Sequence, residues 1–377
     1  MNNLKDPVIS YLEKRGLDRV PFFKNFSSFR EVVIVIPCFD EMENLPTVIN
    51  SFLKSDPPFD ESFGFLFVVN HPDDAPLKRK EESVRTVEYL KQVCTEKSIP
   101  VALIDRFSEG YEVPSKFAGA GFPRKVGLDS ALHLFDPTNY QKSLLVCLDA
   151  DCEVAPSYFS TLKKLARRGC KAAVLEYEHR NDHPGNLGAI SEYETWLRSY
   201  TRGLKIAGSP YAYHFIGSTM LCNVETYVKA GGMNTKKAAE DFYFLESLAK
   251  VAGIETITEK LVFPSNRRSD RVIFGTGKAV NTRLDSGKII KPYPDLIFYR
   301  LKKFLDLYHN DFPSVEELIL AVREADEEVF NFLESYKFSS AMNGIYKSSR
   351  SSKQIARQKD VWFDALKTLR FVHLLSP

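Results

Sequence analysis

Residues 143–154 read SLLVCLDADCEV, and this stretch says more about the fold than any other part of the chain. The apolar run from Leu144 to Leu148 has the length and composition of a buried β-strand. Side chains two residues apart in a strand point to the same side, so Asp149 and Asp151 are expected to converge where the strand leaves the sheet. In open α/β sheets, ligands bind at that carboxyl edge.

Two carboxylates at such an edge suit Mg²⁺ or Mn²⁺, because these ions prefer oxygen ligands. Their remaining coordination positions are then left for water and a diphosphate. The alternative is a structural turn in which one of the two aspartates caps a helix starting near Ala155. Acidic residues are common after buried strands, so the pattern alone leaves both interpretations open.

Segments before this stretch alternate between short apolar runs and amphipathic runs. Strands are expected at 31–38, 65–70 and 101–105, and helices at 44–53, 77–94 and 126–135. The first of these helices begins at Asn44-Leu-Pro46, where Asn44 offers an N-cap and Pro46 suits the first turn. The alternation predicts an α/β fold with a mainly parallel central sheet flanked by helices.

The character of the sequence changes near both ends. Residues 1–30 hold a short amphipathic stretch and an aromatic cluster, and we expect an N-terminal extension that packs on the main domain. The main domain is expected at 31–285. Residues 286–377 show helical periodicity with many charges, which predicts a helical C-terminal region. We expect that region to cover the main domain, to contribute to the acceptor side or to form the contact of a homo-oligomer.

Composition excludes several classes of protein. The 377 residues carry 51 Lys and Arg against 49 Asp and Glu, so no general electrostatic case exists for a nucleic-acid partner. A hydrophobic fraction of 44% excludes wholesale disorder. No apolar run approaches the roughly 18 residues of a membrane-spanning helix. With no apolar signal core and six scattered cysteines, we expect a cytoplasmic protein that can visit the inner membrane face through its C-terminal region.

A second candidate site is the acidic pair Glu240-Asp241, at an expected helix start after the Gly231-Gly232 turn. Acidic residues in a first helical turn complement the helix dipole, and this structural explanation suffices by itself. Alternatively, an Asp held in a cleft could act as a general base on a hydroxyl.

The third candidate is the arginine-rich segment 263–277, which places Arg267, Arg268 and Arg271 ahead of a Gly-Thr-Gly run. Guanidinium groups match phosphate oxygens, so contact with a phosphate is one interpretation. A solvated surface loop is the other.

The order of these segments resembles family 2 glycosyltransferases. IVIPCFDEMENL resembles their opening strand, GAGFPRKVGLDSAL their glycine-rich helix and LLVCLDADCEV their DxD strand. GSTMLC, followed by Gly-Gly and the Glu-Asp pair, resembles their acceptor region. The resemblance covers about residues 31 to 280, and the order of the four parts is more specific than any one of them.

The resemblance implies a GT-A fold, a UDP- or GDP-sugar donor, a divalent metal and inversion at the anomeric carbon. The Gln-x-x-Arg-Trp signature of processive enzymes is absent, which implies a non-processive one. Asp149 and Asp151 match the DxD motif, with Asp151 as the direct metal ligand. Asp241 matches the catalytic base, and Glu240 is its neighbour.

The donor site implied by the resemblance draws on four further segments. Its residues are Pro37, Phe39 and Glu41 of the opening, Asn70, Arg124 of the glycine-rich helix, and Arg267 and Arg271. Asn70 stands where relatives often carry a carboxylate for the uracil ring, and Asp40 replaces their usual Asn. A third metal ligand found in some relatives, a His, is missing from residues 261–280.

These observations predict a metal-dependent transferase that moves a sugar to a hydroxyl acceptor in glycan or polysaccharide biosynthesis. The acceptor is a glycan, a lipid-linked molecule or a small molecule. Two alternatives belong to other classes: a Mg²⁺-dependent phosphatase of the haloacid dehalogenase type, whose motif also ends a strand in Asp-x-Asp, and a non-catalytic protein that binds sugar nucleotides.

Overall fold

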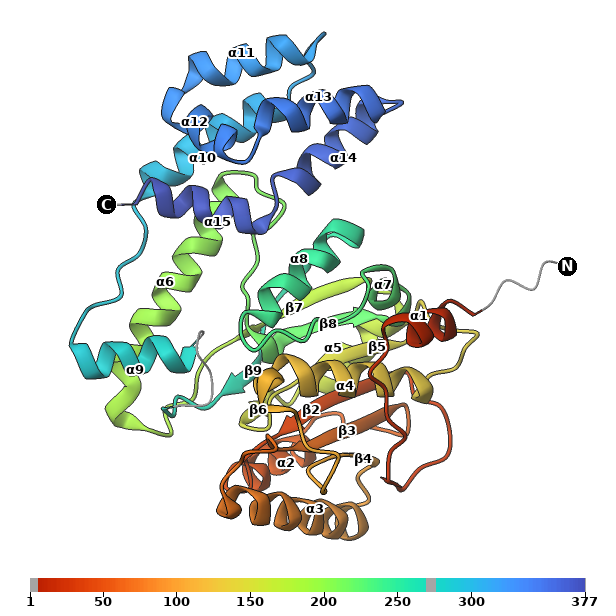
Figure 1. Cartoon of the computed structure of the whole chain (residues 1–377). Coiled ribbons are helices and arrows are strands. Elements are labelled where there is room, and N and C mark those ends of the chain that lie inside the picture. Colours follow the sequence, from red (N-terminus) through yellow and green to blue (C-terminus); the bar gives the residue numbers. More distant parts are fainter. Residues whose placement is uncertain (1–5, 269–275, 377) are drawn as a thin grey trace, which may run out of the picture. The chain divides into compact units, whose positions relative to one another are not determined.

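The computed structural model describes residues 6–268 and 276–376, which form two compact units (Figure 1). The first unit comprises the described residues up to Ile190 and those between Phe215 and Lys288. The second comprises Ser191–His214 and the described residues from Ile289 onward. Helix α6, Leu187–Ile206, begins in the first unit and continues into the second. The sheet belongs to the first unit, and the second is helical.

The described part of the first unit contains a nine-stranded sheet in the order β1-β4-β3-β2-β5-β8-β7-β9-β6. The strands are β1 Phe23–Lys24, β2 Val32–Cys38, β3 Phe63–Asn70, β4 Val101–Arg106, β5 Leu144–Cys147, β6 Cys152–Val154, β7 Ala172–Tyr177, β8 Met220–Asn223 and β9 Glu255–Pro264. Strands β4, β3, β2 and β5 are neighbours and run parallel. Their carboxyl ends therefore share one edge, as expected from the sequence.

The other half of the sheet is mixed. Strand β8 runs antiparallel to β5 and β7, β9 is parallel to β7, and β6 is antiparallel to β9. The predicted parallel order thus describes the β4-β3-β2-β5 half. After β5 the chain leaves the middle of the sheet and enters β6 at its margin, and this jump places a turn at Asp149–Asp151.

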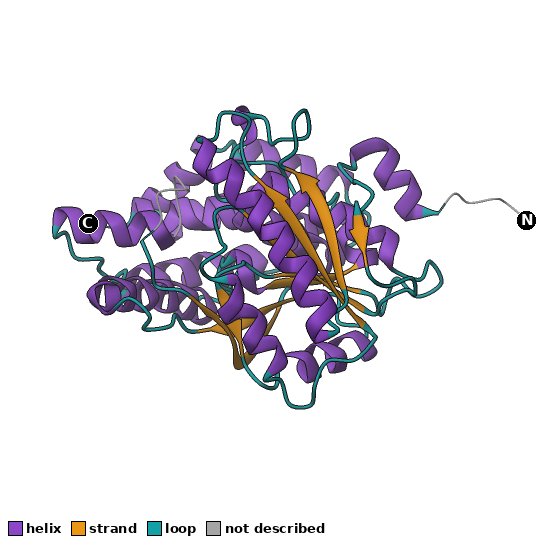
Figure 2. Cartoon of the chain, turned by 90° about the horizontal axis from the view of Figure 1, so that it is seen from below, coloured by secondary structure: helices purple, strands orange, loops and turns teal. Residues whose placement is uncertain are grey.

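Helices lie on both faces of the sheet (Figure 2). In the first unit they are α1 Pro7–Arg15, α2 Leu45–Leu53, α3 Leu77–Lys97, α4 Gly121–Ala131, α5 Tyr158–Arg167, α7 Val224–Lys229, α8 Glu240–Ala252 and α9 Thr276–Ser286. Every residue of α4 is buried. Gly127 allows this close packing, because a Cβ there would lie 2.8 Å from a methyl carbon of Val68 in β3. The sheet thus fixes the helix that carries Arg124.

The N-terminal segment packs on α4 and α7. The Tyr11 hydroxyl donates to Asp129 of α4 (2.7 Å), and so does the Tyr227 hydroxyl of α7. A Cβ at Gly232, whose φ is +75°, would lie 2.6 Å from the Tyr11 ring. The Gly231-Gly232 turn therefore makes room for α1.

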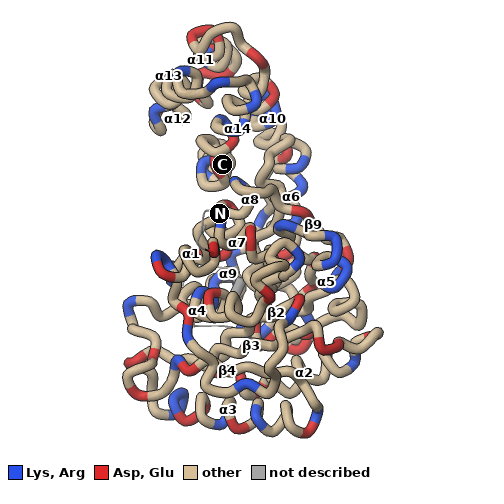
Figure 3. The backbone as a smooth tube through the Cα atoms, turned by 90° about the vertical axis from the view of Figure 1, so that its right-hand side faces the viewer, with Lys and Arg blue, Asp and Glu red and all other residues tan. Residues whose placement is uncertain are grey.

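The second unit contains α10 Asp295–His309, α11 Val315–Ala325, α12 Glu327–Ser335, α13 Phe338–Ser348, α14 Ser352–Trp362 and α15 Ala365–Leu374, besides most of α6. The predicted α/β class with a helical C-terminal region is confirmed. Acidic and basic residues are interspersed over the chain, as Figure 3 shows. Among the described residues, none of the helices combines the length and the apolar character needed to cross a membrane.

Candidate active site

The turn after β5 brings three side chains with metal-ligand atoms together. The Cys152 amide donates to the Asp149 carbonyl (3.1 Å), which closes the turn. The ligand atoms of Asp149, Asp151 and Cys152 all lie within 4.8 Å of one another. The sequence analysis expected the two aspartates to converge through strand alternation. They converge through this turn instead, because β5 ends at Cys147.

Arg124 of α4 joins this turn to the acidic pair at the start of α8. Its Nη2 donates to Asp149 Oδ1 (2.5 Å), and its Nη1 donates to Glu240 Oε1. The guanidinium group is almost fully buried. Burial by itself lowers the pKa of Arg124, but the Asp149 and Glu240 carboxylates outweigh it and raise that pKa. Arg124 is therefore a permanent positive charge between the two candidate sites.

Gly217 provides the space that the Arg124 guanidinium occupies, since a Cβ at position 217 would lie 2.5 Å from Arg124 Nη2. We expect Gly217→Ala to displace this group and to lower the free energy of unfolding by about 1–3 kcal/mol, as overpacking does. Urea denaturation measures the change. Gly188→Ala is the matched control, because a Cβ there meets nothing within 4 Å. If both substitutions lowered the free energy of unfolding equally, Gly217 would not be needed to make space for the Arg124 guanidinium.

Glu240 and Asp241 open α8 in a constrained conformation. Ala239 precedes them with φ of +57°, in the left-handed region that non-glycine residues rarely adopt. Burial raises the pKa of Glu240 to about 7, and this effect exceeds the opposing influence of Arg124. Burial also raises the pKa of Asp241. Both carboxyl groups are therefore stronger proton acceptors, when ionised, than carboxylates in water.

The raised pKa of Glu240 predicts a pH dependence of stability. Between its ordinary value of 4.5 and about 7, the native protein holds a proton on Glu240 that the unfolded chain has lost. The unfolding free energy contributed by this residue therefore falls as the pH rises through that window. We expect the stability of the wild type relative to Glu240→Gln to fall between pH 5 and 7 and to level off near pH 8. A pH-independent difference would show that the pKa is ordinary.

Arg267 occupies the other end of the turn. Its Nη2 donates to Glu41 Oε1 (2.5 Å) and to Asp151 Oδ2 (3.0 Å). The pairing of β6 with β9 causes this proximity, since Cys152 lies opposite Pro264 and Arg267 follows three residues later. Asn44 stands at the N-cap of α2, but its side chain makes no capping bond and donates to Glu41 Oε2 (2.8 Å) instead. Asn44 thus orients the carboxylate that Arg267 contacts.

The residues of the expected nucleotide site lie at the same sheet edge. Pro37 is the penultimate residue of β2, Phe39 follows that strand, and Asn70 ends β3. The Asn70 amide nitrogen donates to the carbonyls of Cys38 (3.1 Å) and Val68 (3.0 Å). Both of its N–H groups are used, which leaves the side-chain oxygen as the acceptor that Asn70 can offer to a ligand.

One expected phosphate contact, Arg268, is not part of this arrangement. Arg268 pairs with Asp285 and donates to Asn281 (3.1 Å) at the surface. Arg271 lies outside the described residues. The structure adds Arg180, which sequence reasoning missed: its Nη2 donates to the Asp151 carbonyl (3.0 Å), and its Nη1 pairs with Glu153. No motif surrounds Arg180, so only the fold identifies it.

The chemistry of the turn fits a hard divalent cation. Asp149 and Asp151 each use one oxygen for an arginine, and the other oxygen of Asp151 accepts a weak hydrogen bond from the Cys152 thiol (3.5 Å). Burial raises the pKa of the Cys152 thiol well above its usual value, so this sulfur is neutral. Oxygen ligands with open positions suit Mg²⁺ or Mn²⁺. Asp149 and Asp151 are therefore the residues that would hold such an ion.

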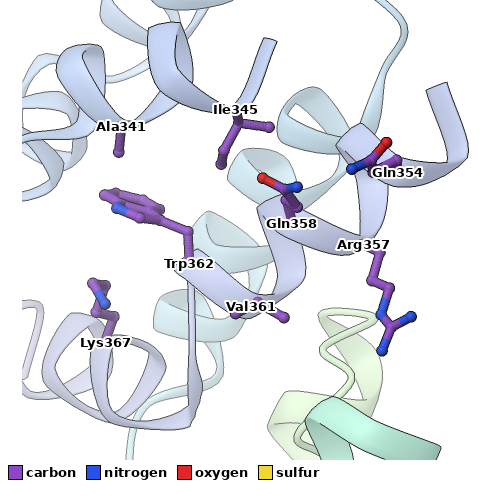
Figure 4. Close-up of a pocket in the computed structure, with 8 residues that line it drawn as sticks. All are labelled: Ala341, Ile345, Gln354, Arg357, Gln358, Val361, Trp362 and Lys367. Carbon is purple, nitrogen blue, oxygen red and sulfur yellow. The ribbon is translucent and has the colours of Figure 1, made fainter. Parts of the chain in front are cut away.

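A separate groove of about 620 Å³ lies in the second unit, between α13, α14 and α15. Figure 4 shows Ile345, Gln358, Trp362 and Lys367 among the side chains that line it. Its lining contains no carboxylate, histidine or cysteine, so it offers neither a metal ligand nor an acid–base pair. This groove is therefore not the candidate active site.

Comparison with solved structures finds several glycosyltransferases at low similarity. TarS 1–349 of S. aureus, in complex with UDP-GlcNAc, is 13% identical with 88% of both chains covered and a TM-score of 0.42. The mannosyltransferase PcManGT of Pyrobaculum calidifontis, in complex with GDP-Man and Mn²⁺, is 15% identical, with 97% of this chain and 94% of that chain covered and a TM-score of 0.40. Glucosyl-3-phosphoglycerate synthase of Mycobacterium tuberculosis is 15% identical, with 74% and 82% covered and a TM-score of 0.38.

No protein-family model matches the chain, and no curated protein matches it. Similarity at this level does not assign a family.

Proposed function

We propose that the protein is an inverting glycosyltransferase of the GT-A kind, which moves a sugar from a UDP- or GDP-sugar to a hydroxyl acceptor. The observation that carries the proposal is the pairing of two acidic sites through one arginine. Arg124 contacts Asp149 of the carboxylate turn and Glu240 of the acidic pair. A donor diphosphate and an acceptor hydroxyl could therefore meet at a single sheet edge.

The donor side is formed by Asp149, Asp151, Glu41 and Arg267. Asp149 and Asp151 would hold a divalent ion, which would supply positive charge to the departing diphosphate. Arg267 lies beside Asp151 and adds a second positive charge in the same place. Pro37, Phe39 and the Asn70 oxygen, at the ends of β2 and β3, are the groups we assign to the nucleoside.

The acceptor side is formed by Asp241 and Glu240. Asp241 accepts the proton of the acceptor hydroxyl while the acceptor oxygen bonds to the anomeric carbon and the bond from that carbon to the diphosphate breaks. Attack from the face opposite the leaving group inverts the anomeric configuration. The raised pKa of Asp241 favours this role, because a base nearer to neutrality transfers the proton more readily. Glu240 and Arg124 hold the start of α8 in place.

A thermal-shift panel of UDP- and GDP-sugars, with and without Mn²⁺, tests the proposal and identifies the donor. A ligand at about a hundred times its dissociation constant stabilises the native state by about 2.7 kcal/mol. We expect one nucleotide sugar to raise the melting temperature by several degrees with Mn²⁺ and much less with EDTA. No shift with any nucleotide sugar would refute the proposal.

A further inference from the structure

Two loops beside the acidic pair carry lysines that no carboxylate neutralises. We define the lysine loops as residues 115–121 and 234–239; they carry Lys116, Lys236 and Lys237. All three side chains are exposed. Within the described residues, none of the three forms an ion pair: Lys116 lies over the Phe117 ring and Lys236 over the Tyr243 ring, at 5.1 and 4.1 Å.

The two lysine loops contact each other and the start of α8. A Cβ at Gly119 would lie 2.7 Å from the Lys237 Cα, and one at Gly121 would lie 3.3 Å from the Asn234 carbonyl and 3.0 Å from the Glu240 Cβ. The Asn234 side chain accepts from the Lys236 amide (3.0 Å) and donates to the Glu240 carbonyl (2.9 Å). The lysines are thus anchored to the backbone that positions Glu240 and Asp241.

A buried guanidinium group adds to this positive charge. Arg106 ends β4 and is 7% exposed, yet it has no carboxylate within ion-pair distance among the described residues. Its Nη2 donates to the Glu112 carbonyl (2.9 Å), and its Nε has no partner. Arg106 lies over Phe122, which stacks on Phe117 of the first lysine loop. Buried charges are normally paired. The Asp105 and Glu112 carboxylates act on Arg106 without forming an ion pair with it, so its charge favours an anion near this loop.

Carboxylates near the loops do not offset the lysines directly. Asp73 contacts Ser115, but its carboxylate accepts from the Ser115 amide (3.1 Å) and hydroxyl and not from Lys116. The arginines of the site are already paired, Arg124 with Asp149 and Glu240, and Arg267 with Glu41 and Asp151. The lysine loops contact the start of α8 at Glu240, whereas Arg267 pairs with Asp151 and Glu41 at the other end of the turn. They are therefore placed for the acceptor, not for the donor diphosphate.

We propose that the acceptor carries a phosphate group, which the lysine loops bind while its hydroxyl faces Asp241. The inference rests on the proposed function for the position of the acceptor. Ammonium groups bind phosphate oxygens through charge-assisted hydrogen bonds. They also offset the repulsion that the carboxylates of the site exert on an anionic acceptor. A free phosphate ester and a lipid headgroup share this chemistry.

The test is direct binding of two probes to the full-length protein without nucleotide. The first probe is glycerol 3-phosphate with glycerol as its neutral partner, followed by calorimetry. The second is a vesicle of phosphatidylglycerol compared with one of phosphatidylcholine, followed by sedimentation. We expect the anionic member of at least one pair to bind at least about tenfold more tightly and to weaken as salt screens the charges. Binding of glycerol 3-phosphate without binding of the vesicle would identify a free phosphate ester as the ligand. Binding of the vesicle alone would identify a phosphate carried by a lipid.

The deciding comparison uses two triple variants. Lys116→Ala/Lys236→Ala/Lys237→Ala should lose the preference for the anionic probe. Lys78→Ala/Lys97→Ala/Lys142→Ala, which removes three exposed lysines elsewhere in the first unit, should keep it. Equal binding of anionic and neutral probes, or an unchanged preference in the first variant, would overturn the inference. Binding of UDP and GDP, measured separately, tells this failure apart from a failure of the proposed function.

Discussion

Asp241→Asn is expected to lower turnover by about 10²–10⁴-fold and to leave nucleotide affinity nearly unchanged. A general base typically contributes that factor to the rate, and it adds little to donor binding. Asn keeps the size of the side chain and its ability to accept from the Phe242 amide, a bond that Asp241 makes at 2.7 Å. Initial rates with the donor found by the thermal-shift panel, together with calorimetry of the same nucleotide, measure both quantities.

The alternative role of Asp241 is purely structural. As a partner of the helix dipole, it would contribute roughly 0.3–1 kcal/mol of stability and nothing to the reaction. Near-wild-type turnover of Asp241→Asn would support that role. A product that retains the anomeric configuration of the donor would also exclude Asp241 as the base of an inverting transfer. Asp60→Asn is a suitable control, since Asp60 pairs with Lys163 and lies before β3, whose opposite end carries the site.

Arg124→Met should lower the free energy of unfolding by about 3–5 kcal/mol. Removing one partner of a buried ion pair leaves an uncompensated charge in a poorly solvated place. Here two carboxylates lose their partner, and the Glu240 side chain is only 7% exposed. Loss of Arg124 raises the pKa of Glu240 further, because Arg124 lowers it in the wild type. Urea denaturation should therefore be repeated from pH 7 to pH 9, since a proton on Glu240 would remove part of the penalty.

A double variant separates the charge effect from lost packing. In Arg124→Met/Glu240→Gln the buried carboxylate is neutral, so part of the lost stability should return. Residues in contact typically show coupling energies of 0.5–3 kcal/mol, either sign, in such cycles. Strictly additive effects of the two substitutions would show that Arg124 acts through packing alone.

The sequence predicted the parallel half of the sheet well, because its strands are apolar, short and separated by clear helices. The segment Val32–Cys38 illustrates this, since the strand lies where the β-branched run stands. The antiparallel half could not be predicted. Strand β6 has only three residues, and its pairing with β9 joins segments about a hundred residues apart. Such pairings depend on how the whole chain packs and not on local pattern.

In the candidate site, too, local motifs could be predicted from the sequence and long-range contacts could not. The Asp149–Asp151 pair, the Glu240-Asp241 pair and Arg124 of the glycine-rich helix are visible as parts of motifs. The sequence does not show that Arg124 joins the two acidic pairs. Arg124 reaches Glu240 across 116 positions, and Gly217 matters only because the guanidinium group needs its space. The Gly231-Gly232 turn had been grouped with the acceptor region, yet the Tyr11 ring explains why a glycine stands at 232.

Calorimetry of UDP and GDP tests the central claim most directly. The claim is that Asp149 and Asp151 hold a divalent ion that binds a nucleoside diphosphate. For the wild type, we expect one nucleotide to bind with Mn²⁺ or Mg²⁺ and to lose most of its affinity in EDTA. For Asp151→Ala, we expect weak binding under both conditions. Binding of Asp151→Ala as tight as that of the wild type, unaffected by EDTA, would contradict the account.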